Sequence, residues 1–167
     1  PLDGAELSTT QMVDRVAGWA ARYPILSIED PVSQDDVAGM ADATARFGQR
    51  VQVIGDDFLV TNAERVRKAA AAGACNAVLV KVNQAGTVSR AKAALEAARA
   101  LGWSAIVSAR SGETEDVSIA HLSTGWDAGQ LKVGSFTRSE RMAKWNELLR
   151  IEEEMGADAV FAGAGAL

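Results

Sequence analysis

Short runs of apolar and β-branched residues recur along this chain at intervals of about 25 residues, and this spacing restricts the fold more than any other feature. The segments between the runs show the periodicity of amphipathic helices. Alternating buried strands and helices are typical of α/β proteins, in which right-handed crossovers place parallel strands side by side. The expected strands are ILSIE at 25–29, VQVIG at 51–55, AVLVK at 77–81, AIVS at 105–108 and QLK at 130–132.

Four segments outside the expected strands carry a recognisable helix start, in which a short polar side chain precedes the first helical turn. The even strand spacing favours a barrel over an open sheet. An eight-stranded barrel typically needs about 250 residues, so five strands in 167 residues predict only part of one. The expected starts are Ser8 with Gln11, Ser33 with Asp36, Asn62 before Ala63, and Thr137 with Glu140.

The composition is that of a globular domain and excludes several kinds of partner. Hydrophobic residues make up 48% of the chain, and the net charge of -5 without a Lys/Arg cluster argues against a nucleic-acid-binding surface. Cys75 is the only cysteine, which excludes an internal disulfide or thiolate metal site and favours the cytoplasm. No apolar run approaches the roughly 18 residues of a membrane span, so no membrane partner is expected.

Charged residues follow every expected strand, and in parallel α/β folds these strand ends share one rim where ligands bind. We therefore expect the five strand ends to converge on one polar cavity. The residues are Glu29 and Asp30, Asp56 and Asp57, Lys81, Arg110 with Ser111, and Lys132.

Four of the strand-end residues also have a simpler interpretation. Asp30 and Asp57 could be N-caps of the following helices, and Lys81 could reach solvent along its alkyl chain. Arg110 could cap a helix or pair with Glu113 or Glu115. It is less plausible that all of these separate interpretations apply at the same rim of the sheet than that the residues form one shared site.

The residue types at these strand ends indicate the chemistry. Carboxylates without a nearby histidine or cysteine suit a hard cation such as Mg²⁺. Two lysines, an arginine and a hydroxyl suit an anionic substrate that bears a carboxylate or a phosphate. A lysine crowded by other cations can be neutral and basic near neutral pH, which suits proton abstraction.

The strand-end motifs resemble, in order, those of enolase, the phosphopyruvate hydratase of glycolysis. The resemblance implies the C-terminal part of the enolase barrel over residues 1–167, with strands four to eight present and the N-terminal domain and first three barrel strands absent. It also implies a homodimer for the full-length parent. The motifs are SIEDP at 27–31, GDDFLVTN at 55–62, GACNAVLVKVNQAGT at 73–87, SARSGETED at 108–116 and GQLKVGSFTRSERMAKWNELLRIEEE at 129–154.

The resemblance implies a Mg²⁺-dependent lyase that dehydrates 2-phosphoglycerate to phosphoenolpyruvate. Enolase-superfamily sites use a lysine or histidine base with Mg²⁺ stabilising the intermediate. By the matching motifs, Lys81 is the base that removes the C2 proton. The remaining roles carried over are metal ligation by Glu29 and Asp56, phosphate binding by Arg110 and Ser111, and carboxylate binding by Lys132.

Two departures from the enolase pattern leave alternatives open. Ala109 stands where the family motif has a histidine, and the only histidine, His121, is expected to be exposed on the next helix. The third carboxylate ligand and the acid glutamates of the family lie upstream, so the isolated chain is expected to be inactive. A paralogue acting on a related phosphorylated or phosphonylated hydroxy acid, or a non-catalytic enolase-like binding module, remains an alternative. An unrelated anion-binding open sheet would need a Gly-rich loop after the first strand, which SIEDPVSQDD lacks.

Three smaller features have structural interpretations. Cys75 is expected to be a buried small hydrophobe, and the Glu152–Glu154 run a solvated helix face. The small-residue tail AGAGAL, residues 162–167, is expected to be loose.

Overall fold

Strand and helix alternate through residues 4–167, the part of the chain that the computed structural model describes, and the chain divides into two units after Ser104. The first unit contains α1 (Thr9–Arg22), β1 (Ser27–Glu29), α2 (Val37–Phe47), β2 (Gln52–Gly55), α3 (Ala63–Ala71), β3 (Ala77–Val80), α4 (Val82–Ala85) and α5 (Val88–Ala100). Strand β4 (Ser104–Ser108) begins at the boundary. The second unit continues with α6 (Ser118–Gly125), β5 (Gly129–Lys132), α7 (Ser139–Met155) and the 3-10 turns η1 (Gly156–Asp158) and η2 (Gly163–Ala166).

In the first unit β1, β2 and β3 form a parallel sheet in chain order. Glu29 lies opposite Ile54, and Gly55 lies opposite Val78, so the carboxyl ends of the three strands lie at one edge. Every residue of β2 and β3 is buried, as expected for parallel strands that are covered on both faces. The parallel pairing predicted from the sequence is confirmed for these strands.

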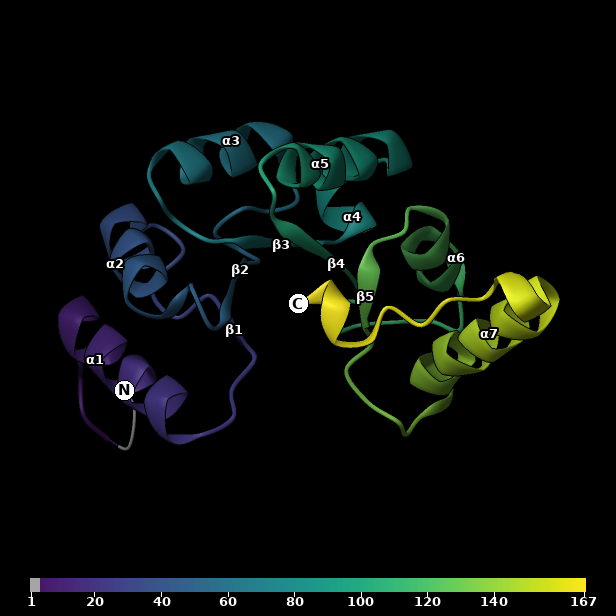
Figure 1. Ribbon diagram of the computed structural model, residues 1–167, viewed down its shortest axis with the longest axis horizontal. Helices are drawn as coiled ribbons and strands as arrows, with labels where there is room; N and C mark the ends of the chain where they lie inside the picture. Colours follow the sequence, from purple (N-terminus) through teal and green to yellow (C-terminus); the bar gives the residue numbers. More distant parts are fainter. Residues whose placement is uncertain (1–3) are drawn as a thin grey trace. The chain divides into compact units, whose positions relative to one another are not determined.

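The helices of the first unit cover the sheet through small and branched side chains. Helices α3 and α5 lie side by side over β3, as Figure 1 shows. The buried face of α5 consists mainly of alanines with Leu95, and the small alanine side chains let the two helices approach closely. Met40 of α2 and Phe47 at its end fill the core beside β2.

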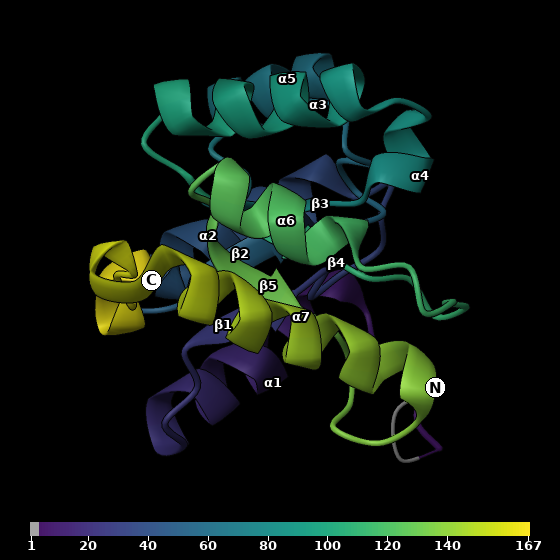
Figure 2. The same cartoon turned by 90° about the vertical axis from the view of Figure 1, so that its right-hand side faces the viewer.

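The second unit is built on the parallel pair β4 and β5, with Ser108 opposite Lys132. Helix α6 contacts both β5 and α7, and Figure 2 shows α7 running alongside these elements. The tail is ordered against β5, because the Gln130 side-chain amide donates to the Ala166 carbonyl at 2.6 Å. The expectation of a loose tail is therefore wrong for residues 163–166, which form η2.

Two of the four predicted helix starts are confirmed. Ser8 accepts the Gln11 amide, and the Gln11 side chain accepts the Ser8 amide, which completes a capping box on α1. Asn62 caps α3 by accepting the amides of Glu64 and Arg65.

The other two predicted starts are wrong: another side chain caps α2, and no side chain caps α7. Helix α2 begins at Val37 with Asp36 as its N-cap, since the Asp36 carboxylate accepts the Gly39 amide and also the Thr9 hydroxyl. Helix α7 begins at Ser139, because Thr137 is held in a turn in which the Ser135 hydroxyl accepts its amide.

No helix in residues 4–167 has the length and apolar character required to cross a membrane.

Candidate functional site

Lys81 and Asp56, which follow β3 and β2, form a buried ion pair. The Lys81 Nζ lies 2.5 Å from Asp56 Oδ2, and the two residues are 9% and 8% exposed. The alternative in which Lys81 reaches solvent is therefore wrong. A buried charge is tolerated when an opposite charge and hydrogen bonds meet it, and the adjacent positions of β2 and β3 supply that partner.

Asp30, directly after β1, fixes the loop that carries Asp56. One Asp30 carboxylate oxygen accepts the Asp56 amide at 2.9 Å, and the other accepts the Asp57 amide at 2.8 Å. Burial raises the pKa of Asp30, and these backbone donors oppose that rise. Neither Asp30 nor Asp57 is a helix N-cap, because Asp36 and Asn62 hold those positions.

Gly55 allows the same loop to close tightly over the end of β2. A Cβ at this position would meet the Leu59 side chain at 2.5 Å and the Cys75 Sγ at 3.2 Å. Leu59 is fully buried, so there is little room for it to move. The glycine before Asp56 is thus required by packing.

A second group of polar side chains surrounds the Lys81–Asp56 pair. The Thr61 hydroxyl accepts the Lys81 amide at 2.9 Å and donates to Gln84 Oε1 at 2.8 Å. The Gln84 Nε2 lies 3.4 Å from Asp56 Oδ1 and 3.5 Å from Asp57 Oδ1. Hydrogen bonds from both neighbouring loops therefore converge on the pair.

Glu29 ends β1 beside β2, where the sequence predicted a second metal ligand. Its carboxylate and that of Asp56 are hard oxygen donors, and Asp56 Oδ1 has a long contact with Gln84 Nε2 at 3.4 Å, so the donor chemistry fits Mg²⁺. Within residues 4–167 no cluster of three or more acidic, histidine or cysteine side chains forms a complete metal site. These two carboxylates could thus supply part of a Mg²⁺ site.

In the second unit the predicted anion-binding residues follow β4 and β5. Lys132 ends β5, and its carbonyl accepts the Ala109 amide at 2.9 Å, which ties the ends of the two strands together. Arg110 and Ser111 come next after Ala109. Glu113 accepts the Arg110 backbone amide at 2.6 Å, so these two residues are in contact.

Two buried cations of α7 hold the Arg110 loop, and neither is among the predicted site residues. The Arg141 guanidinium donates to the carbonyls of Arg110 and Ser111, each at 2.8 Å, and to the Val133 carbonyl at 2.9 Å. Lys144 is fully buried and pairs with Glu113 at 2.9 Å. Their spacing of three residues on a helix places them on one face, which was the available signal.

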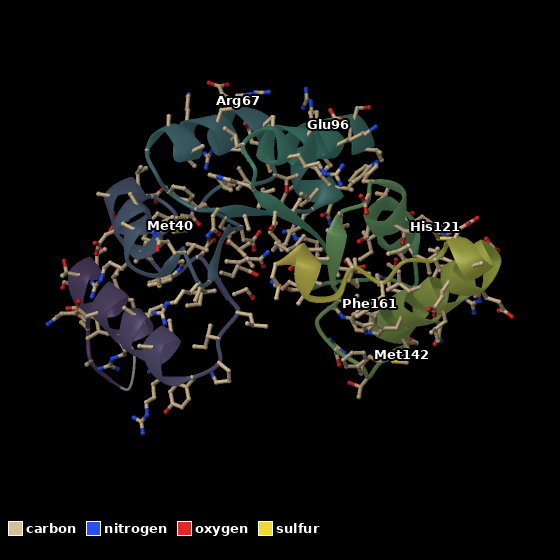
Figure 3. All side chains as sticks on the ribbon, in the orientation of Figure 1. Met40, Arg67, Glu96, His121, Met142 and Phe161 are labelled. Atoms are coloured by element: carbon tan, nitrogen blue, oxygen red, sulfur yellow. The ribbon has the colours of Figure 1, made fainter. Side chains whose placement is uncertain are left out.

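Ala109, which stands where the motif resembled in the sequence has a histidine, follows β4 directly and is 8% exposed. His121 lies on α6 as predicted, and Figure 3 shows it on the side of α7. Its Nε2 is 2.9 Å from Glu147 of α7, and its side chain is exposed. His121 therefore makes an exposed side-chain contact between α6 and α7.

Cys75 is a buried, free thiol, as predicted. Burial, with a smaller contribution from the Asp30 charge, raises the pKa of Cys75 to about 12. It is therefore a packing residue and is not an activated nucleophile.

Parallel strands with charged residues at their carboxyl ends, each followed by a helix, define an α/β protein. Residues 3–167 match the family described as enolase, C-terminal TIM barrel domain. The chain is 51% identical over 163 residues to an enolase of Solanum lycopersicum and 51% identical over 159 residues to enolase 2 of Hevea brasiliensis. These matches cover 97% and 95% of the chain.

The chain therefore belongs to the enolase family, and the predicted fold class, a partial TIM-type barrel, is confirmed. The matches cover 37% and 36% of the two relatives, so the chain spans little more than a third of their length.

Proposed function

We propose that this chain is the C-terminal barrel part of a longer Mg²⁺-dependent lyase that dehydrates 2-phosphoglycerate to phosphoenolpyruvate, a cytoplasmic reaction of glycolysis. The observation that carries the proposal is the buried contact between Lys81 and Asp56 at the ends of β3 and β2. Membership of the enolase family supports it. The proposal assigns Lys81 as the base and Asp56 as a metal ligand beside it.

The first chemical step is transfer of the C2 proton of the substrate to the Lys81 amine. In the ion pair with Asp56, Lys81 is an ammonium, so it must first release one proton to solvent before its amine can accept the C2 proton. Removal of the proton places a second negative charge on the substrate carboxylate, and cations around that group are needed to stabilise it. Mg²⁺ held by Glu29 and Asp56 would supply charge neutralisation at this point.

The second step expels the C3 hydroxyl as water and leaves the enol phosphate product. We assign Arg110 and Ser111 to the phosphate group and Lys132 to the carboxylate. Arginine suits the phosphate because its planar donors match two oxygens at once. The acid that protonates the leaving hydroxyl, and the homodimer, belong to the longer protein in this proposal.

Turnover of 2-phosphoglycerate by the longer protein tests the proposal. Wild type is expected to be active only with Mg²⁺, and Lys81→Met to be inactive while still binding Mg²⁺. Lys92→Met is a matched control, since Lys92 is an exposed lysine of α5. A Lys81→Met variant with wild-type turnover would exclude Lys81 as the base.

The buried Ala109 favours a second candidate, a paralogue that acts on a related phosphorylated or phosphonylated hydroxy acid. A non-catalytic binding module is a third candidate. Mg²⁺-dependent binding of a phosphonate that mimics the enolate intermediate separates it from the enzymes, because only a catalytic site has a reason to bind such a compound tightly.

A further inference from the structure

Thr61 has a backbone conformation that its residue type rarely adopts. It ends the loop between β2 and α3 with φ 52°, directly after Val60 with φ 44°. Two consecutive β-branched residues in the left-handed region are strained, and such strain persists only where the surrounding structure holds it. Thr61 is also 2% exposed, so its hydroxyl must find partners within the protein.

The hydroxyl of Thr61 finds those partners on the segment that carries Lys81. The register of β2 and β3 pairs Gly55 with Val78. Just beyond the end of β3, the Thr61 hydroxyl accepts the Lys81 amide at 2.9 Å. A side chain from the Asp56 loop thus anchors the backbone of Lys81. The same loop supplies the Asp56 carboxylate that meets the Lys81 Nζ.

The second bond of Thr61 orients the Gln84 amide. The single hydroxyl hydrogen has two acceptors, and Gln84 Oε1 at 2.8 Å is nearer than the Leu79 carbonyl at 3.3 Å, so the Gln84 Nε2 faces Asp56 Oδ1. Thr61 therefore acts on both members of the ion pair, directly on the Lys81 backbone and through Gln84 on Asp56.

From these contacts we propose that Thr61 is a positioning residue that sets the reach of the Lys81 amine toward the substrate. The proposal rests on the proposed function, in which Lys81 is the base. A base displaced by about 1 Å can lose about a hundredfold in rate without a change in substrate affinity. Loss of the Thr61 hydroxyl is therefore expected to lower kcat and to leave KM unchanged.

The kinetic test uses the longer active protein with three variants. Thr61→Val keeps the side-chain shape without the hydroxyl, and its kcat is expected to fall about tenfold to a hundredfold with KM within about twofold. Thr61→Ser keeps the hydroxyl and is expected to recover most of kcat. Thr44→Val is the matched control, because the Thr44 hydroxyl accepts the Cys75 amide at 2.9 Å and donates to the Met40 carbonyl, whereas the Thr61 hydroxyl accepts the Lys81 amide. Its kcat and KM should equal those of wild type.

A second measurement does not depend on turnover. In Thr61→Val the Lys81 amide is expected to exchange with deuterium faster than in wild type, and the NMR signal of the Lys81 ammonium is expected to shift, whereas Thr44→Val changes neither. An inactive wild type would refute the proposed function. The deuterium-exchange and NMR comparison would then decide by itself whether Thr61 positions Lys81. The positioning role is overturned if Thr61→Val matches Thr44→Val in both measurements, or if Thr61→Ser fails to recover activity and Lys81 amide protection.

Discussion

Replacement of Asp30 by asparagine tests how the loop after β2 is held. The Asp30 carboxylate accepts two backbone amides, those of Asp56 at 2.9 Å and Asp57 at 2.8 Å. Asparagine keeps one acceptor oxygen and places an NH₂ group against the other amide. Because asparagine tolerates a positive φ well, the φ of 38° at this position adds little strain to the variant.

The expected destabilisation follows from these two bonds. A hydrogen bond to a charged group contributes about 1.5–3 kcal/mol, and the lower value applies here because the bond to Asp57 is exposed. One such bond is lost and the other becomes a neutral bond of about 1 kcal/mol. Burial raises the pKa of Asp30 because it disfavours the charged carboxylate. Asparagine carries no charge, so part of the lost free energy is recovered. We expect Asp30→Asn to lower the free energy of unfolding by about 1.5–2 kcal/mol.

Urea unfolding of wild type and Asp30→Asn measures this difference. Asp35→Asn is the control, since it makes the same charge change on an exposed residue of the same unit and should stay within about 0.5 kcal/mol of wild type. A loss below about 0.5 kcal/mol for Asp30→Asn, equal to the control, would refute the view that this carboxylate holds the loop.

Three further outcomes are expected. Lys144→Met leaves Glu113 without its ion-pair partner and should lower the free energy of unfolding, measured in urea, by about 3 kcal/mol. The control Lys92→Met, on the exposed face of α5, should change it by less than about 0.5 kcal/mol. Similar losses in both variants would contradict a structural role for the Lys144–Glu113 pair. Cys75 should react with a thiol reagent at pH 8 only after unfolding, and rapid labelling of the native protein would show that the thiol is accessible. Because the native pKa of Cys75, about 12, exceeds the ordinary value of 9.0, the free energy of unfolding should fall as the pH rises above 9.0. In a 2-phosphoglycerate assay Ala109→His should change kcat/KM by less than about tenfold, and a much larger gain would favour the paralogue.

The strands could be predicted from the sequence because their apolar runs form a buried parallel sheet. The run at 77–81 is an example, since Ala77–Val80 are all fully buried and Lys81 follows immediately. The contact between Lys81 and Asp56 was also predictable, because adjacent parallel strands end at one edge. Family membership then confirmed the type of barrel.

The support around the site could not be predicted, because it depends on tertiary contacts between residues far apart in the chain. Asp30 binds amides more than twenty residues away, and its sequence position equally suits a helix cap. The spacing of Arg141 and Lys144 indicates a shared helix face, but the carbonyls that Arg141 binds lie about thirty residues away and have no sequence signal. The role of Thr61 could not be predicted, because no sequence pattern indicates a positive φ at a threonine.

The assignment of Lys81 as the base is tested most directly by exchange of the C2 proton. The longer protein is incubated with Mg²⁺ and 2-phosphoglycerate deuterated at C2, and loss of deuterium to the solvent is followed by NMR. Wild type is expected to release the deuterium, and Lys81→Met to release none while binding Mg²⁺ as wild type does. Release at the wild-type rate by Lys81→Met would contradict the account.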